Sequence, residues 1–182
     1  MKRVLAIGMM VCTLGSALCR AESVSLLHTF NTMKDAGTLT FPDAPGSYAV
    51  GVTDFATYTG SNGGQFGMDG SLIAFSLPTR TSTLVISPAV QGLSDIYITQ
   101  SAGKKTTWIK VYVSEDGSSW TDMSDVATYS ATTIDLILPT SGNYYVKLVN
   151  EGTASPAQPV YLRSIRYTYD PTPCNCFRYI AP

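Results

Sequence analysis

Histidine, cysteine and charged residues are all scarce in this chain. Its 182 residues include one histidine and four cysteines, and only 14% are charged, against the roughly 25% of an average soluble domain. A single histidine, His28, argues against the hydrolytic triads and histidine-rich metal sites of many enzymes. The 12 basic residues nearly balance the 13 acidic ones, so the sequence has no basic surface of the kind that nucleic-acid binding needs.

Only one long hydrophobic run occurs, and it lies close to the first residue. Lys2 and Arg3 precede an apolar stretch of about 15 residues, which is shorter than the roughly 20 residues that span a bilayer. This pattern predicts a secretory signal peptide over residues 1–21 and no transmembrane segment. A lipid anchor at Cys12 or Cys19 fits less well, because each follows a large apolar residue. We therefore expect an exported protein at an extracellular, cell-surface or periplasmic site.

Beyond the signal peptide, cysteine is confined to the last residues. Cys174 and Cys176 alone remain there, so a disulfide scaffold is excluded, and whether these two thiols pair is left open. We expect one domain over residues 22–170 and a tail over 171–182. An alternative is that the chain is a fragment whose partners include other domains of a longer protein. The part from residue 22 onward has nine basic and thirteen acidic residues, which gives an acidic domain.

The sequence is rich in valine, isoleucine, threonine and aromatic residues, which favour β-strands over helices and disorder. Turn-forming Gly, Pro, Asn, Asp and Ser recur at intervals of roughly 8 to 12 residues, with no helical period between them. This rhythm predicts an all-β fold, an antiparallel two-sheet β-sandwich of jelly-roll type. The expected strands are 24–31, 38–41, 48–58, 71–77, 83–87, 95–100, 106–114, 120–123, 133–138, 144–150 and 161–169.

The best-defined element is a hairpin from Trp108 to Trp120 with an Asp-Gly turn. If Asp116 and Gly117 form a two-residue turn, Val113 faces Trp120 and both side chains point into the core. A three-residue loop with a bulge would shift the pairing by one residue and turn Trp120 outward. The two registers therefore differ in where they place this tryptophan.

Strand alternation places aliphatic side chains on one face and aromatic ones on the other. Pyranose rings pack their C–H faces on Trp or Tyr, and lysine and hydroxyl groups supply directional hydrogen bonds. An outward aromatic face would therefore suit a polysaccharide or glycoconjugate, although a partner domain could cover it instead. The proposed ligand-binding residues of this face are Tyr97, Trp108, Lys110, Tyr112, Tyr145 and Lys147.

The segment I-K-V-Y-V-S-E-D-G-S-S-W-T-D-M over residues 109–123 resembles the V-Y-x-S-x-D-G-x-x-W hairpin of discoidin-like, galactose-binding-like jelly rolls. The strands at 142–150 and 161–169 are similar to the last strands of that family. The resemblance implies a jelly-roll accessory module of a secreted bacterial carbohydrate-active protein. Two family features are missing, the pair of terminal disulfide cysteines and a carboxylate cluster matching the calcium site of related sugar-binding jelly rolls.

A second candidate site is the glycine-rich segment 59–70. Its glycines could let the backbone approach a sugar or a cation, Asn62 and Gln65 could form hydrogen bonds, and Phe66 could stack on a ring. The alternative is a flexible loop without a ligand. The segment lacks the Lys-Ser/Thr ending of a phosphate-binding loop.

Catalytic and metal-binding residues are hard to assemble from this sequence. Glu151 and Asp135 are the only pair we consider for a glycosidase, and no Gly-x-Ser-x-Gly motif accompanies His28. We expect no cofactor, although scattered carboxylates could contribute to a calcium site; these are Asp35, Asp43, Asp54 and Asp69. The expected function is therefore non-catalytic carbohydrate binding. The alternative is a structural or adhesive domain that docks a neighbouring domain or protein at the cell surface.

Overall fold

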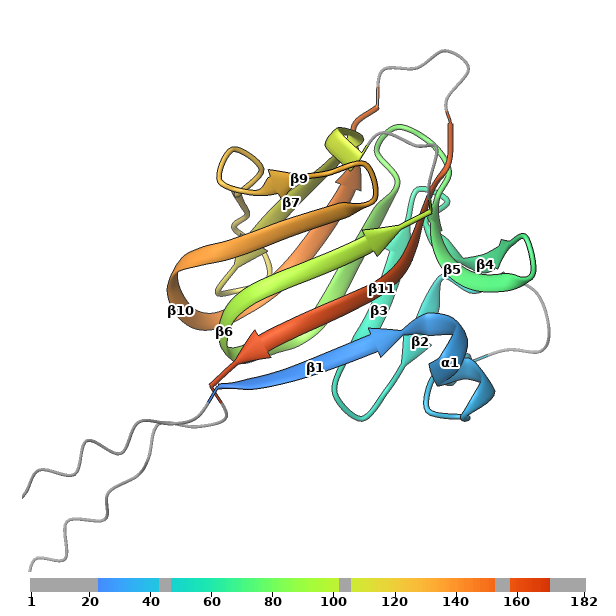
Figure 1. The fold of residues 1–182 in the computed structure, drawn as a ribbon, viewed down its shortest axis with the longest axis horizontal. Coiled ribbons are helices and arrows are strands. Elements are labelled where there is room, and N and C mark those ends of the chain that lie inside the picture. The colour runs from blue at the N-terminus through green and yellow to red at the C-terminus, as the bar shows by residue number, and fades with distance from the viewer. Residues whose placement is uncertain (1–22, 43–46, 102–105, 153–157, 171–182) are drawn as a thin grey trace, which may run out of the picture.

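The computed structural model describes residues 23–42, 47–101, 106–152 and 158–170 (Figure 1). The expected signal peptide, Asp43 and the tail with Cys174 and Cys176 lie outside these residues. The elements in chain order are β1 (Val24–Thr29), α1 (Phe30–Asp35), β2 (Val50–Val52), β3 (Thr57–Ser61), β4 (Gln65–Asp69), β5 (Leu72–Leu77), β6 (Thr83–Gln100), η1 (Thr106–Trp108), β7 (Ile109–Ser114), β8 (Thr121–Asp122), β9 (Thr128–Tyr129), β10 (Thr133–Asn150) and β11 (Val160–Tyr169).

The described strands form one antiparallel sheet, which confirms the predicted all-β, antiparallel class. The order along its main path is β4-β5-β11-β6-β10-β7-β8, with β1 added to β11, β9 to β10, and β3 to β6. Two 18-residue strands, β6 and β10, run the length of the sheet. Each replaces two of the expected short strands, so the elements that we expected to form two sheets are joined into one.

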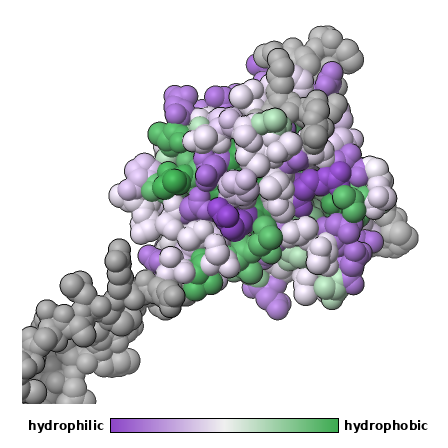
Figure 2. All heavy atoms as spheres, viewed as in Figure 1, coloured by the Kyte–Doolittle hydropathy of each residue, from purple (hydrophilic) through white to green (hydrophobic). Residues whose placement is uncertain are grey.

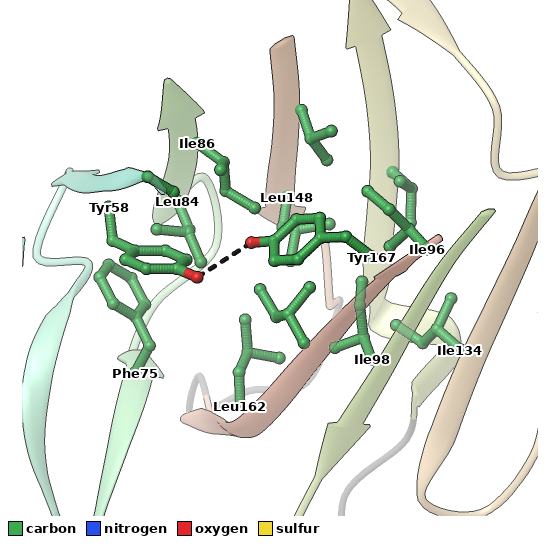
Figure 3. Close-up of a cluster of buried hydrophobic side chains, with 14 of the residues drawn as sticks. Tyr58, Phe75, Leu84, Ile86, Ile96, Ile98, Ile134, Leu148, Leu162 and Tyr167 are labelled. Atoms are coloured by element: carbon green, nitrogen blue, oxygen red, sulfur yellow. Dashed lines mark hydrogen bonds between the residues drawn. The ribbon is translucent and has the colours of Figure 1, made fainter. Parts of the chain in front are cut away.

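The sheet folds over on itself because β6 and β10 bend. Tyr58 in β3 pairs with Ile86, and Tyr167 in β11 pairs with Ile96. Ten residues of straight strand would span about 33 Å. The hydroxyl oxygens of Tyr58 and Tyr167 are nevertheless 3.0 Å apart (Figure 3). The part of the sheet that carries β2, β3, β7 and β8, here the β7 half, therefore faces the part that carries β1, β4, β5, β9 and β11, the β11 half.

One hydrophobic core fills the space between the two halves. Aliphatic side chains alternate along each long strand, so that every second residue points into the core, as at Ile96 and Ile98. Tyr58 and Tyr167 are fully buried among them and satisfy each other's hydroxyl groups. The core side chains of the central strands are Leu84, Ile86, Ile96, Ile98, Val111, Ile134, Leu136, Val146, Leu148, Leu162 and Ile165.

The predicted first strand ends early, and a short helix follows it. β1 pairs with β11 only as far as Thr29 opposite Ser164. β5 pairs with the next part of β11, with Phe75 opposite Leu162. Since this edge of β11 is already occupied, the chain leaves the sheet and forms α1. Phe30 is buried at the start of the helix, where its ring packs edge-on against aromatic side chains of the core.

The segment 38–58 also differs from the prediction. The expected strand 38–41 is reduced to a single bridge between Thr40 and Val52. The expected strand 48–58 is interrupted by a turn in which the Thr53 hydroxyl accepts hydrogen bonds from the backbone N–H groups of Phe55 and Ala56. β2 and β3 therefore form a hairpin rather than one strand.

The surface seen in Figure 2 is the outer side of the β11 half. Hydrophobic residues occur there in separate groups between hydrophilic ones. The most exposed large hydrophobic side chains of the described chain are Leu27, Met68, Val126 and Ile137. Within the described ranges, no helix has the length and apolar character needed to cross a lipid bilayer.

Candidate ligand-binding surface

The outer face of the β7 half carries most of the predicted aromatic and lysine side chains. Antiparallel pairing sets Lys147 of β10 opposite Tyr112 of β7, and Tyr112 opposite Asp122 of β8. Directly paired residues project to the same side of a sheet, so these three side chains form a row. We name this surface the Lys147 face, and its members are Lys110, Tyr112, Trp120, Asp122, Tyr145, Lys147 and Glu151.

Trp120 belongs to this surface, which the preferred hairpin register did not predict. The structure pairs Val113 with Thr121, one residue beyond the predicted partner. The register with Val113 opposite Trp120 is therefore wrong, and the alternative register, shifted by one residue, is confirmed. The turn is longer because Asp116 accepts hydrogen bonds from the backbone N–H groups of Ser118 and Ser119, at 2.8 and 2.7 Å. These bonds hold the Asp116 pKa well below its usual range.

Lys147 lies between two aromatic rings. Its Nζ atom is 4.2 Å from the centre of the Trp120 ring and 4.9 Å from that of Tyr112. Both distances are within the roughly 6 Å of a cation–π contact. Partial burial lowers the Lys147 pKa. The lysine thereby fixes the positions of the two rings and places its ammonium donor between them.

Glu151 holds the hydroxyl group at the end of the Tyr112 side chain. This hydroxyl group donates a hydrogen bond of 2.8 Å to Oε1 of the carboxylate. Partial burial, followed by the bond to Glu151 and its charge, raises the Tyr112 pKa to about 12. The tyrosine therefore stays a neutral donor at ordinary pH.

The charges on this face balance one another. Lys110 and Lys147 supply two positive groups, and Asp122 and Glu151 supply two carboxylates. Partial burial of Asp122 is outweighed by hydrogen bonds from Ser124 and by the charge of Lys110, so its pKa is lowered and it is ionised at neutral pH. The face has no net charge and suits a neutral ligand better than a strongly charged one.

Two other predicted aromatic residues are Tyr145, which belongs to the Lys147 face, and Trp108, which does not. Tyr145 is half-buried, and its ring lies beside Gly117 in the hairpin turn. Trp108 lies in η1 rather than in a strand, and its ring packs on Gly152, where a Cβ atom would lie 2.7 Å from the ring. Trp108 also contacts the core. The Trp108 ring therefore exposes less of its surface to a ligand than it would from an outward position in a strand.

Tyr97 does not join the other aromatic residues. It lies in the part of β6 that pairs with Asp135 and Arg166, on the outer face of the β11 half. The Arg166 guanidinium is 4.7 Å from the centre of the Tyr97 ring. Because the two halves face each other across the core, Tyr97 and the Lys147 face lie on opposite outer surfaces.

The glycine-rich segment 59–70 is largely β-structure. It contains the end of β3, a turn at Asn62 and Gly63, and β4. Phe66 is 1% exposed and packs against other aromatic rings of the core, so it is a core residue and not a stacking residue for a ligand. Gln65 is half-buried opposite Ser76 in the strand pair.

Asn62 and the glycines of this segment have structural roles. The side chain of Asn62 donates to the carbonyl oxygen of Thr81 at 3.0 Å. A Cβ atom at Gly64 would lie 2.3 Å from the carbonyl oxygen of Thr83. Gly64 therefore allows its own backbone to lie close to the backbone at Thr83, where a side chain would collide.

The structure does not bring the candidate glycosidase pair together. Asp135 lies near the start of β10, in the β11 half, whereas Glu151 follows the other end of the same strand and lies in the β7 half. Asp69 forms an ion pair with Arg163, and Asp35 accepts a hydrogen bond from Asn31. Among the described residues, no group of three or more His, Cys, Asp or Glu side chains could hold a metal ion.

His28 is buried in β1 rather than exposed at a site. Its Nδ1 atom hydrogen-bonds the hydroxyl group of Tyr58, which in turn bonds to Tyr167. Burial lowers the His28 pKa to about 4. The histidine is thus part of a buried polar chain that also holds the two core tyrosines.

No protein-family model matches the sequence, and no curated protein shows significant similarity to it. We therefore infer function from the arrangement of the side chains themselves.

Proposed function

We propose that this protein is an exported, non-catalytic carbohydrate-binding module that holds a neutral polysaccharide on the Lys147 face. The observation that carries the proposal is the arrangement of Tyr112 and Trp120, two half-buried rings on one sheet face with an ammonium donor between them. Sugar rings pack on such aromatic surfaces through their C–H groups. Fixed rings also lose little conformational freedom on binding, which favours affinity.

The folded sheet supports the same proposal. Its two halves enclose one core in the manner of a β-sandwich, and we propose that it is of the jelly-roll type found in galactose-binding-like modules. The paired outward residues Lys147, Tyr112 and Asp122 lie across three neighbouring strands. A sugar chain lying across these strands would meet an ammonium group, aromatic carbon and a carboxylate in turn.

A glycan array followed by affinity measurement tests the proposal. Wild-type protein should bind at least one neutral polysaccharide, and Trp120→Ala should weaken that binding at least tenfold. Tyr97→Ala is the matched control, because this aromatic residue lies on the opposite outer surface. Equal affinity of Trp120→Ala and wild type would reject the Lys147 face as the site. Failure to bind any glycan would favour the alternative, a structural or adhesive domain that docks another protein.

A further inference from the structure

β1 lies at the margin of the β11 half, and one of its two edges is unpaired (Figure 1). Its six residues all pair with β11, from Val24 opposite Tyr169 to Thr29 opposite Ser164, without a register shift. Within the described ranges, no strand and no backbone hydrogen bond reaches the other edge of β1. The N–H and C=O groups on that edge are therefore available to a further strand.

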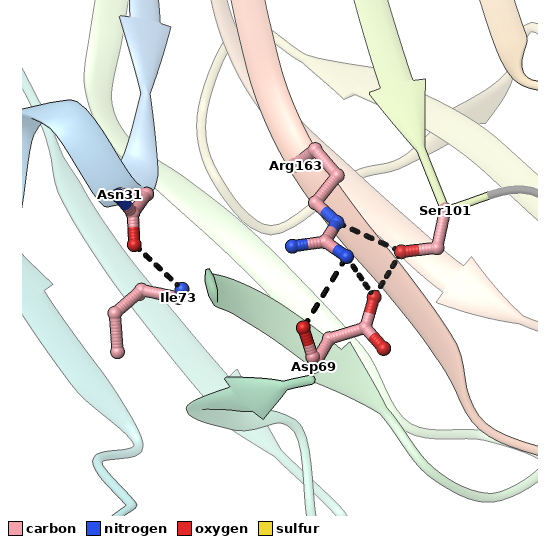
Figure 4. Close-up of polar contacts among 5 residues, drawn as sticks. All are labelled: Asn31, Asp69, Ile73, Ser101 and Arg163. Atoms are coloured by element: carbon pink, nitrogen blue, oxygen red, sulfur yellow. Dashed lines mark hydrogen bonds and ion pairs between the residues drawn. The ribbon is translucent and has the colours of Figure 1, made fainter. Parts of the chain in front are cut away.

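Most other edges of the described sheet are occupied or short. Bridges made by Thr40 and Tyr48 occupy the outer edges of β2 and β4. At the start of β5, the side-chain oxygen of Asn31 accepts a hydrogen bond from the backbone N–H of Ile73 at 3.0 Å (Figure 4). β8 and β9 have two residues each, and the part of β10 beyond β9 contains Pro139, which has no N–H to donate. β1 differs from these strands, because it is regular and contains neither proline nor a charged residue to protect its edge.

A pocket of about 550 Å³ lies beside this free edge. Leu26, Leu27 and His28 of β1 form one wall, and residues of the segments 33–40 and 52–55 form the other. β11 contributes no residue to this lining, so the pocket lies on the side of β1 that is turned away from β11. A strand added to the free edge would therefore project its inward side chains into the pocket, as in other cases of strand addition.

β1 itself has the pattern that such an added strand needs. Leu26 and His28 lie on the inward side of the strand, whereas Ser25 and Leu27 are exposed on the outward side. Leu27 is 57% exposed, which leaves a large apolar side chain uncovered at the centre of the strand. Because β1 carries no charge, two copies of this edge would not place like charges opposite each other.

We propose that two copies of this protein pair β1 with β1 in antiparallel fashion, about a two-fold axis at Leu27, and so form a dimer with a continuous sheet. Directly opposite residues project to the same side of an antiparallel pair. In this register Leu27 covers Leu27 of the partner subunit, and Leu26 enters the pocket opposite His28 of the partner subunit. A two-fold contact closes after two copies, so both free edges become paired. The inference does not depend on the proposed function.

Sedimentation velocity between about 5 μM and 1 mM protein tests the proposal, because one strand pair is a small interface and should have a dissociation constant of roughly 10 to 100 μM. Leu27→Lys would place two ammonium groups opposite each other at the axis, and it should raise this constant at least tenfold. Val126→Lys is the matched control. Val126 is 53% exposed and precedes β9, at the margin of the β11 half opposite β1. Thermal unfolding checks that both variants are folded.

Hydrogen exchange of the backbone amides shows whether β1 forms the interface. The β1 amides should exchange more slowly at the highest protein concentration than at the lowest, in wild type and Val126→Lys but not in Leu27→Lys. A wild type that stays monomeric over the whole concentration range would contradict the proposal, and so would a dimer whose dissociation constant is unchanged in Leu27→Lys. Slow exchange of the β1 amides in a monomer would show that the chain itself covers this edge, which would also overturn it.

Discussion

The ammonium group of Lys147, on the long strand β10, lies 4.2 Å from the centre of the ring of Trp120, which follows the hairpin turn after β7. The same ammonium group is 4.9 Å from the centre of the Tyr112 ring. This lysine therefore links the two rings that we assign to ligand binding. Its removal should affect both the stability of the face and its affinity.

Lys147→Met is expected to lower the free energy of unfolding by about 1 kcal/mol, because a partly buried cation–π contact is worth about that much. Urea denaturation measures this change. Lys110→Met on the neighbouring strand is the control, since no cation–π contact involves Lys110 within the described chain. Equal losses in the two variants would show that the aromatic contacts of Lys147 contribute nothing.

The buried tyrosine pair predicts a second stability effect. Tyr58→Phe removes the partner of both His28 and Tyr167, so it should destabilise the protein by roughly 1 to 3 kcal/mol. Tyr167→Phe removes one bond and should cost less. A double-mutant cycle measures whether the two hydroxyl groups act together. Strict additivity of the two losses would contradict the hydrogen bond between them.

His28 predicts a pH dependence of stability. Burial lowers its folded pKa to about 4, whereas an unfolded histidine has a pKa of 6.5. The unfolded chain therefore binds a proton as the pH falls through 6.5, while the folded protein does not until about pH 4. The free energy of unfolding therefore carries no penalty from His28 above pH 6.5. Between pH 6.5 and pH 4 it falls by at most about 3 kcal/mol because of this group. His28→Gln should remove this loss, as urea denaturation at pH 7 and pH 4.5 would show. Parallel pH profiles of variant and wild type would refute it.

Asp95 and Asp135 predict an effect of the opposite sign. Burial, followed by the neighbouring carboxyl group of Asp135, raises the Asp95 pKa. The ionised form of Asp95 is therefore disfavoured in the folded protein, and this cost disappears as the pH falls through the raised folded pKa of Asp95. Asp135→Asn should stabilise the protein at pH 7 by roughly 0.5 to 1 kcal/mol and have little effect near pH 3. Thermal unfolding at both pH values checks this, and destabilisation at pH 7 would count against it.

The sequence predicted the fold class because strand alternation is a local signal. Ile96 and Ile98, or Val111 and Val113, mark inward positions whatever lies across the sheet. The bends of β6 and β10 and the early end of β1 were not predictable in this way. They depend on which strands pair, and β1 ends where β5 takes its place beside β11.

The candidate site was predicted in part for the same reason. Alternation correctly placed Tyr112 and Lys147 on one outward face, because their strands are neighbours. It grouped Tyr97 with them wrongly, since outward residues on the two halves of a folded sheet point in opposite directions. Trp120 was missed because a one-residue change in turn length moves it from the core to the surface. The pairing of Asp69 with Arg163 was not predicted because 94 residues separate them.

The most direct test of the account is the affinity of the Tyr112→Ala and Tyr97→Ala variants for the polysaccharide that wild type binds best, measured by isothermal titration calorimetry. Tyr112 lies in the centre of the Lys147 face, and Tyr97 lies on the opposite outer surface. We predict at least a tenfold loss of affinity for Tyr112→Ala and wild-type affinity for Tyr97→Ala. Wild-type affinity in folded Tyr112→Ala, or an equal loss in both variants, would contradict the assignment of this face.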